Sequence, residues 1–369
     1  MNAEKLIFVV MNTTDFLPKR YRQSTVSGSV TVQSPSNIAL VKYWGKHGEQ
    51  LPKNASISFT LNNCHTTTTL HFEPKKDTGF SFEVFLEGVK TPSFYPKIEA
   101  FFKRVQPYIP FIEKYAFTIE TSNSFPHSSG IASSASGMSA LAYCLTTLEK
   151  SISTEELPDS YWTQKTSFLS RLGSGSACRS IEGPLVVWGA HDTIPKSSDL
   201  YGTLFSFKVH PVFQNYRDTI LLVDRGEKQV SSTVGHNLMH NHPFAEQRFT
   251  QANQNLEALS EVLQKGAIDD FIAIVESEAL SLHAMMMTSQ PYFILMKPNT
   301  LAIINHIWDF RKTTGSKVCF TLDAGANVHV LYPEKEKKQV LDFIKSQLVR
   351  YCDNSKFIAD FVGTGSKLM

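Results

Sequence analysis

The chain of 369 residues is long enough for two domains, because a single hydrophobic core rarely grows past about 250 to 300 residues. A hydrophobic fraction of 42% and a charged fraction of 19% are ordinary for a globular protein and exclude a disordered or fibrous chain. The net charge of +2 gives no field that would attract nucleic acid, and the longest early apolar run, residues 6–10, is too short to span a membrane. We therefore expect a cytoplasmic protein whose partners include neither nucleic acid nor a membrane.

The first part of the chain is predicted to mix strands with helices. Alternating apolar residues predict half-buried, antiparallel strands, and apolar residues at helical spacing predict helices between them. The predicted strands are 27–35, 56–63, 66–74, 114–122 and 183–190, and the predicted helices are 95–109, 137–150 and 159–173.

The second part is predicted to be richer in long helices. The irregular stretch 197–218 is expected to hold the boundary, which gives domains at 1–210 and 211–369. The predicted strands are 219–224, 317–323 and 327–333, and the predicted helices are 249–266, 267–287, 300–315 and 335–349. Helices packed on antiparallel strands make α+β the expected fold class.

A run of small residues precedes the helix predicted at 137–150. Backbone amides at a helix start attract phosphate oxygens, and small residues let a phosphate approach them closely. Gly130 can take backbone angles barred to other residues, and Ser133, Ser134 and Ser136 add hydroxyls for phosphate or, at Ser134, for magnesium. The alternatives are a flexible linker or a tight helix-packing turn, and a Walker A loop is excluded because no Gly-Lys-Ser/Thr follows.

This stretch, "PHSSGIASSASG", resembles the second motif of the GHMP kinase superfamily. Three further segments make the chain similar to the diphosphomevalonate decarboxylase family: "SPSNIALVKYWGK" (34–46), "GSGSACRS" (173–180) and "TLDAGANVHVL" (321–331). Residues 230–235 are a fifth, weaker match to that family. The motifs lie in the order expected for that family, and the similarity begins near residue 28. It implies a two-domain GHMP kinase fold, with a ribosomal protein S5 domain 2-like N-terminal domain and a ferredoxin-like C-terminal domain.

The resemblance also implies the chemistry. Such enzymes use ATP and Mg²⁺ to phosphorylate the tertiary 3-hydroxyl of mevalonate 5-diphosphate, after which phosphate and carbon dioxide leave and isopentenyl diphosphate remains. Two alternatives are a related mevalonate 3-kinase that stops before decarboxylation and a non-catalytic GHMP-fold protein that binds a metabolite. A homodimer is also implied, although the sequence itself neither supports nor excludes it.

Four residues take catalytic roles by the same resemblance. Asp323 would orient or deprotonate the 3-hydroxyl and stabilise the developing cation, while Arg179 would hold the C1 carboxylate and Asn37 would orient that arginine. Lys42 would reach the transferred phosphate. Taken without the resemblance, Asp323 would equally suit a turn or helix cap, and Arg179 a structural ion pair.

The substrate's diphosphate would be bound by a further set of residues, with Trp44 used for packing. Without the resemblance, the segment around Lys42 would be read as an edge strand with charged ends. The substrate-binding residues that the resemblance implies are Tyr43, Lys46, Ser174, Ser176 and Ser232.

Several positions depart from the family pattern. Ala326 stands where the motif after the acid usually has proline, Pro184 replaces the second glycine of a common pair, and His236 stands where methionine is usual. Met285–Met287 and His283 are expected to pack inside a helix bundle, and no role can be derived for the residues before the first matching strand. The cysteines are widely spaced without a C-x-x-C pair, which predicts reduced thiols: Cys64, Cys144, Cys178, Cys319 and Cys352.

Overall fold

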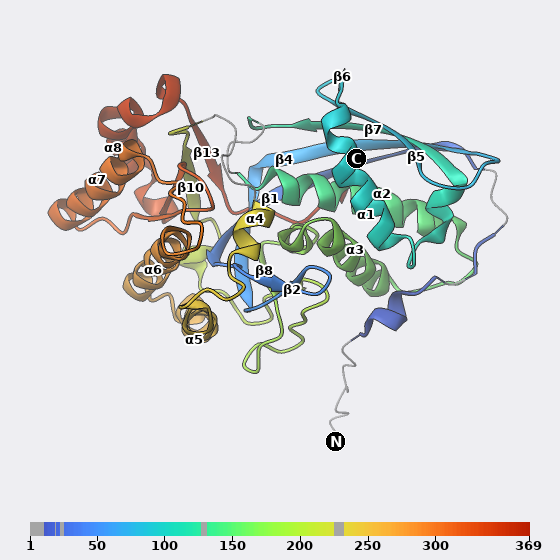
Figure 1. Ribbon diagram of the computed structural model, residues 1–369. Coiled ribbons are helices and arrows are strands. Elements are labelled where there is room, and N and C mark those ends of the chain that lie inside the picture. Colours follow the sequence, from blue (N-terminus) through green and yellow to red (C-terminus); the bar gives the residue numbers. More distant parts are fainter. Residues whose placement is uncertain (1–10, 19, 23–25, 127–130, 225–231) are drawn as a thin grey trace.

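The computed structural model describes residues 11–18, 20–22, 26–126, 131–224 and 232–369 (Figure 1). Within these residues, the larger sheet has eight strands, of which six run in the order β14-β1-β4-β7-β5-β6, while β8 pairs with β4 and β9 with β8. Their bounds are β1 (Gly28–Val41), β4 (Ser56–Pro74), β5 (Ser81–Leu86), β6 (Val89–Lys90), β7 (Tyr115–Asn123), β8 (Leu185–Trp188), β9 (Thr203–Leu204) and β14 (Lys367–Leu368).

The strands predicted at 56–63 and 66–74 form one long strand, β4, so the prediction of two strands was wrong. The first half of β4 pairs with β8 and the second half with β7, while β1 runs antiparallel along both halves. Shifts in register along β1, between Pro35 and Asn37 and between Ala39 and Val41, let the pair bend without breaking. The pairing is antiparallel as predicted except between β5 and β7, which is parallel.

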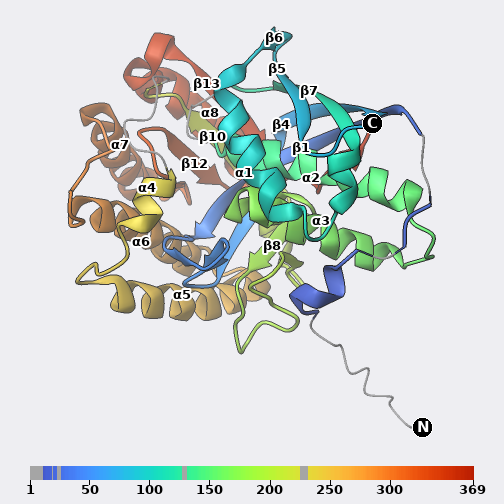
Figure 2. The ribbon, with the colours of Figure 1, turned by 45° about the vertical axis from the view of Figure 1, so that its right-hand side comes forward.

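Three helices accompany the larger sheet: α2 lies against β1 and β4, and α3 packs on α1 and α2 (Figures 1 and 2). They are α1 (Tyr95–Val105), α2 (Ser133–Ile152) and α3 (Asp159–Gly173). Helix α2 begins four residues before the predicted start at residue 137, so Ser133, Ser134 and Ser136 lie in its first turn.

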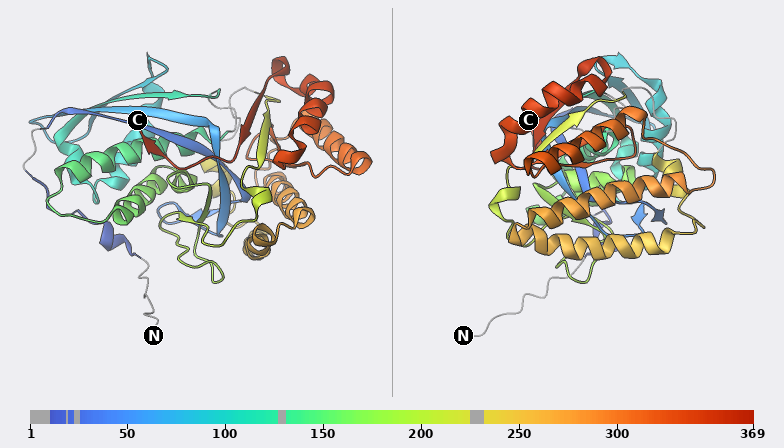
Figure 3. Two further views of the ribbon diagram at one scale, coloured as in Figure 1. Left: turned by 180° about the vertical axis from the view of Figure 1, so that it is seen from behind. Right: turned by 90° about the vertical axis from the view of Figure 1, so that its left-hand side faces the viewer.

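The second sheet has the order β11-β12-β10-β13 and is antiparallel throughout. Its strands are β10 (Arg217–Leu221), β11 (Cys319–Thr321), β12 (Val328–Tyr332) and β13 (Phe357–Phe361). Long helices follow in the same part of the chain: α6 contacts β11, and α5 and α6 lie side by side (Figure 3). The helices are α4 (Ser232–Asn237), α5 (Ala245–Lys265), α6 (Ile268–Met287), α7 (Pro298–Thr314) and α8 (Lys337–Phe343). The α+β class is confirmed.

Shorter elements complete the fold. The helix predicted at 335–349 is interrupted, because α8 gives way to a π-helical turn. A small hairpin is formed by β2 (Lys46–His47) and β3 (Leu51–Pro52). The short helical turns are η1 (Thr13–Phe16), η2 (Pro92–Phe94), η3 (Pro110–Lys114), η4 (Gly175–Ser180), η5 (Pro211–Phe213), η6 (Glu334–Glu336), η7 (Ile344–Leu348), η8 (Val349–Tyr351) and η9 (Asp353–Ser355).

The two sheets are joined by a shared core and by the end of the chain. One cluster of buried apolar residues combines Ile38 and Ile57 of the larger sheet with Leu256 and Phe271 of α5 and α6. Strand β14 pairs with β1, so the last residues return to the first sheet. The division at residue 210 remains a prediction.

The residues before β1 pack onto α2 and α3, a role that the sequence did not indicate. Phe16 is fully buried and stacks on Phe168, with ring centroids 4.6 Å apart. The Tyr21 hydroxyl donates a hydrogen bond of 2.8 Å to Glu149, which also pairs with Lys165 inside the helical layer. This segment therefore acts as part of the core. In the part of the chain that is described, no helix has the length and apolar character needed to cross a bilayer.

Candidate active site

A cavity of about 710 Å³ lies between the start of α2, the end of β1 and the turn that follows β11. It collects nine of the predicted site residues from segments far apart in the chain: Lys42, Tyr43, Lys46, Ser133, Ser134, Ser174, Ser176, Arg179 and Asp323. The described lining has five basic side chains, Lys42, Lys46, Lys97, Arg104 and Arg179, against one acidic side chain, Asp323. Such a cavity suits a ligand with several negative charges.

Of the other four predicted site residues, two lie at least partly outside the described structure and two are buried beside the cavity. Gly130 lies outside the described residues, as do residues 230 and 231 of the weaker motif and the side chain of Ser232, which begins α4. Asn37 is buried behind the cavity wall. Its Nδ2 donates to Ser180 Oγ at 2.8 Å, and its Oδ1 accepts a longer hydrogen bond of 3.4 Å from Arg179 Nε, which is the contact expected of a residue that orients the arginine.

Ser136, the fourth, faces away from the cavity. It is fully buried, and its hydroxyl lies 2.6 Å from Thr66 Oγ1 on β4. Ser139, one turn later, lies 2.5 Å from Ser34 Oγ on β1 in the same way. The small residues thus serve two purposes, because one side of α2 uses them to approach the sheet closely and the other presents Ser133 and Ser134 to the cavity. The structure does not bring Ser136 to the expected phosphate site.

Arg179 is a buried cation whose hydrogen-bond partners are neutral side chains. The guanidinium donates to Ser56 Oγ and Asn37 Oδ1 and lies 5.9 Å from the centre of the Trp188 ring. Burial lowers the pKa of Arg179 from its ordinary value. Within the described ranges no carboxylate forms an ion pair with it, although a buried charge normally requires one. An anionic ligand would supply the missing partner.

The turn that carries Arg179 lies close to Tyr43 because Gly175 has no side chain. A Cβ added at Gly175 would lie 2.7 Å from Trp188 and 2.9 Å from the Tyr43 hydroxyl, so a larger residue would push the loop away. Ser174 and Ser176 flank this glycine and line the cavity.

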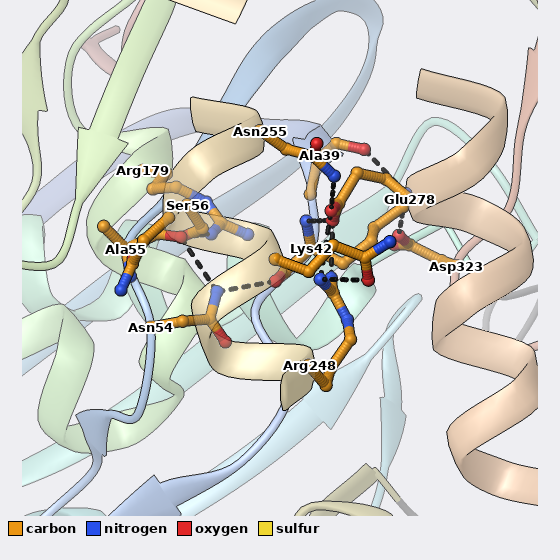
Figure 4. A network of polar contacts seen from close by, with 12 residues as sticks. Ala39, Lys42, Asn54, Ala55, Ser56, Arg179, Arg248, Asn255, Glu278 and Asp323 are labelled. Carbon is orange, nitrogen blue, oxygen red and sulfur yellow. Dashed lines mark hydrogen bonds and ion pairs between the residues drawn. The ribbon is translucent and has the colours of Figure 1, made fainter. Parts of the chain in front are cut away.

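Lys42 and Asp323, which both line the cavity, form an ion pair (Figure 4). Lys42 Nζ lies 3.2 Å from Asp323 Oδ1 and donates to the Ala39 carbonyl at 2.6 Å. The lysine side chain is 2% exposed and the aspartate side chain 27%, so the carboxylate is the partner that a ligand can reach. Burial lowers the pKa of Lys42, and the Asp323 carboxylate opposes that shift.

Two buried residues that sequence reasoning missed hold this pair in place. Glu278 of α6 accepts the backbone N–H of Lys42 at 2.8 Å, and it also binds Arg248 and Asn255 of α5 (Figure 4). His283, expected only to pack, donates from Nε2 to the Asp323 carbonyl at 3.1 Å. Burial lowers the pKa of His283 to about 4, so it is a neutral donor. Neither contact has a sequence signal, because each joins segments more than 35 residues apart.

The other end of the cavity has an apolar wall that the sequence also did not reveal. Lys97 of α1 donates to Ser134 Oγ at 2.8 Å, beside the first turn of α2. The apolar side chains there come from β5, β7, α1, α2 and the turn before α1: Val84, Phe94, Ile98, Ile119 and Leu141. A flat apolar group attached to phosphates would match this combination.

A metal ion would need ligands from a bound molecule. Among the residues described, no cluster of three or more His, Cys, Asp or Glu side chains could hold one. The hydroxyls of Ser133 and Ser134 and the carboxylate of Asp323 are hard oxygen donors that fit Mg²⁺ when phosphate oxygens complete its shell.

Fold and cavity together define a phosphate-binding protein of the GHMP kinase type. Residues 34–199 match the family model "Diphosphomevalonate decarboxylase-like N-terminal domain", and residues 219–365 match "Mevalonate 5-diphosphate decarboxylase C-terminal domain". The chain is 30% identical over 334 residues to a diphosphomevalonate decarboxylase of Ganoderma lucidum, covering 85% of this chain and 80% of the relative. It therefore belongs to the diphosphomevalonate decarboxylase family.

Solved structures agree in fold. The structure described as "MDDEF in complex with MVAPP, AMPPCP and Magnesium" superposes with a TM-score of 0.80 at 26% identity, covering 93% of this chain and 99% of that one. Mevalonate diphosphate decarboxylase from Staphylococcus aureus gives a TM-score of 0.79 at 27% identity, covering 93% and 98%. The GHMP kinase fold implied by the motifs is thereby confirmed.

Proposed function

We propose that the protein catalyses the ATP-dependent decarboxylation of mevalonate 5-diphosphate to isopentenyl diphosphate, with ADP, phosphate and carbon dioxide as the other products. The observation that carries the proposal is the convergence of Asp323, Lys42 and Arg179 in one cavity with the start of α2. Family membership and the relative whose description includes MVAPP, AMPPCP and magnesium support the same substrate and cofactors.

The reaction makes two electrostatic demands. The terminal phosphoryl group of ATP must pass to the 3-hydroxyl of the substrate, which loses its proton. The C3–O bond then breaks as phosphate leaves, and the electrons of the C1–C2 bond form the C2–C3 double bond while carbon dioxide departs. Positive groups must surround the phosphates, and a negative group must face C3 as it becomes cationic.

Asp323 and Lys42 answer these demands as a pair. The carboxylate, partly exposed in the cavity, can accept the hydroxyl proton or orient the hydroxyl, and its charge then faces the developing cation. Lys42 Nζ, 3.2 Å from that carboxylate, is placed to meet the transferred phosphate beside the same hydroxyl. A site with little water strengthens both interactions.

Arg179 would hold the C1 carboxylate of the substrate. Asn37 and Ser56 fix the guanidinium from behind, which leaves its remaining donors for a planar anion. Holding C1 this way fixes the direction in which the C1–C2 bond breaks. The diphosphate at the other end of the substrate would be bound by Tyr43, Lys46, Ser174, Ser176 and, by family resemblance, Ser232.

ATP would enter from the apolar end of the cavity. The adenine would lie against the wall that includes Val84 and Ile98, and the phosphates would meet Ser133 and Ser134 at the first turn of α2, with Gly130 expected in the preceding loop. Lys97 and the two serines would hold nucleotide and Mg²⁺ from the protein side. When bound, Mg²⁺ neutralises part of the phosphate charge.

The decisive experiment measures ADP and carbon dioxide together. With mevalonate 5-diphosphate the two should appear in equal amounts, and with mevalonate or its 5-monophosphate turnover should be far slower. Asp323→Asn keeps the size of the side chain and should lower carbon dioxide release by roughly 10²- to 10⁴-fold while leaving ATP affinity nearly unchanged. Asp309→Asn, on the exposed side of α7, is the matched control and should leave the rate unchanged.

The same assay separates the alternatives. ADP without carbon dioxide from mevalonate 5-diphosphate would identify a 3-kinase, and neither product would identify a non-catalytic binding protein. Full activity in Asp323→Asn would refute the role assigned to that residue. A cytoplasmic location, a homodimer and the absence of nucleic acid partners remain predictions.

A further inference from the structure

His236 is placed at the cavity by α4, next to the residues proposed to bind the diphosphate. Its ring packs on Tyr43 and Trp44, with ring centroids 4.3 Å and 4.6 Å away. The residue lines the cavity and is only 8% exposed. A histidine so closely packed has one fixed orientation.

The hydrogen bond to Gly45 settles which ring nitrogen carries the proton. The backbone N–H of Gly45 donates to His236 Nδ1 at 2.9 Å, and a backbone N–H can only donate. Nδ1 is therefore unprotonated and the proton is on Nε2. Burial, helped by the charges of Lys46 and Arg179, lowers the pKa of His236 to about 3, so the ring stays neutral at ordinary pH.

This leaves Nε2–H as the one polar group of the ring without a partner among the described residues. Its surroundings are themselves donors and cations. Arg179 has no acidic ion-pair partner among the described residues, Lys46 is hydrogen-bonded to the neutral side chain of Gln50 at 2.9 Å, and Ser174 and Ser176 add hydroxyls to the cavity lining. An anion that these groups share would satisfy the neutral donor and the cations together.

We propose that the Nε2–H of His236 donates a hydrogen bond to the diphosphate of the substrate, which makes His236 a substrate-binding residue. The identity of the ligand rests on the proposed function. The diphosphate is chosen over the C1 carboxylate because His236 packs on Tyr43, whereas Asn37 and Ser56 fix Arg179 for the carboxylate. The diphosphate is chosen over ATP because the phosphates of ATP are proposed to bind at the start of α2.

Three substitutions separate a donor from a packing role. His236→Gln can place an amide N–H near the position of Nε2, whereas the shorter His236→Asn reaches only the position of Nδ1 and can still accept from Gly45. His236→Met keeps an apolar side chain of similar size and has no donor. The matched comparison is therefore between the Gln and Asn variants, which differ by one methylene group.

The measurement is calorimetric binding, without nucleotide, of mevalonate 5-diphosphate and of inorganic pyrophosphate. Loss of a hydrogen bond to a charged oxygen should raise the Kd for both about 10- to 100-fold in the Asn and Met variants, and Gln should recover most of the affinity. In turnover, KM for mevalonate 5-diphosphate should rise more than kcat falls, because the contact is made equally before and during the reaction. The melting temperature and the affinity for ATP should change little.

Unchanged Kd values in the Asn and Met variants would overturn the inference. Equal losses of affinity in all three variants, together with a lowered melting temperature, would also overturn it, because that pattern indicates that His236 only packs. The proposed function fails separately, if the unmodified protein releases no carbon dioxide from mevalonate 5-diphosphate. Binding of pyrophosphate would still test the donor in that case.

Discussion

Removing the carboxylate of Glu278 should destabilise the protein severely. Its side chain is 0% exposed and that of Arg248 is 1% exposed, so Glu278→Ala leaves a guanidinium buried without its counter-ion. The same change removes the acceptor of Asn255 and of the Lys42 backbone N–H. Breaking a buried ion pair from one side costs about 3 to 5 kcal/mol. Since each kcal/mol lowers the melting temperature of a large domain by about 2 to 4 °C, a fall of roughly 6 to 20 °C is expected.

Thermal denaturation followed by circular dichroism measures this fall. The control is Glu261→Ala, which breaks an exposed pair between neighbouring turns of α5 and should leave the melting temperature unchanged. The double variant Glu278→Met with Arg248→Met removes both charges and should recover more than half of the loss, because the penalty comes from the stranded charge. A single variant that melts within about 2 °C of the unmodified protein, or a double variant as unstable as the single one, would refute this reasoning.

Three further predictions concern other buried groups. Burial lowers the pKa of His283 from 6.5 to about 4, so the contribution of the neutral ring to stability is complete above pH 6.5 and is lost as the pH falls toward 4. The melting temperature of His283→Gln should therefore fall less steeply on acidification than that of the unmodified protein. Equal slopes in the two proteins would contradict this prediction. Phe16→Ala should lower the free energy of unfolding, measured by urea denaturation, by about 3 to 5 kcal/mol. Leu17→Ala, at the neighbouring residue that is 43% exposed, should change the free energy of unfolding little. Similar losses of stability in the Phe16 and Leu17 variants would argue against a structural role for the N-terminal segment. Burial raises the pKa of all five cysteine thiols, Cys64, Cys144, Cys178, Cys319 and Cys352. A thiol reagent should therefore label none of them in the native protein and all five in urea. Rapid labelling of the native protein would contradict this prediction.

Local chemistry made part of the site predictable. The small residues before α2 and the acid after β11 carry signals within a few positions, and nine predicted residues line one cavity. Ser136 shows the limit of such signals. A serine in the first turn of a helix suits a phosphate contact or a packing contact equally well, and only the position of β4 decides between them.

The missed residues act through distant parts of the chain. Glu278 binds the backbone of Lys42, 236 positions away, and His283 binds a carbonyl 40 positions away. Each side chain fits an ordinary helical pattern, so nothing in the local sequence separates it from packing residues. The merging of two predicted strands into β4 has the same origin, because β1 supplies partners along both halves and the intervening polar residues need not form a turn.

Lys42 explains why the site depends on contact between the two sheets. Its backbone follows β1 of the larger sheet, yet its N–H is held by α6 and its ammonium by the residue that follows β11. The Asp323 carboxylate offsets part of the cost of burying the ammonium, and His283 of α6 donates a hydrogen bond to the carbonyl of Asp323. Arg179, by contrast, is fixed from within the first part of the chain by Asn37 and Ser56. The side chains that fix Arg179 therefore come from β1 and β4 of the larger sheet, whereas the half of the cavity that meets the transferred phosphate requires α6 and β11 to be docked against β1.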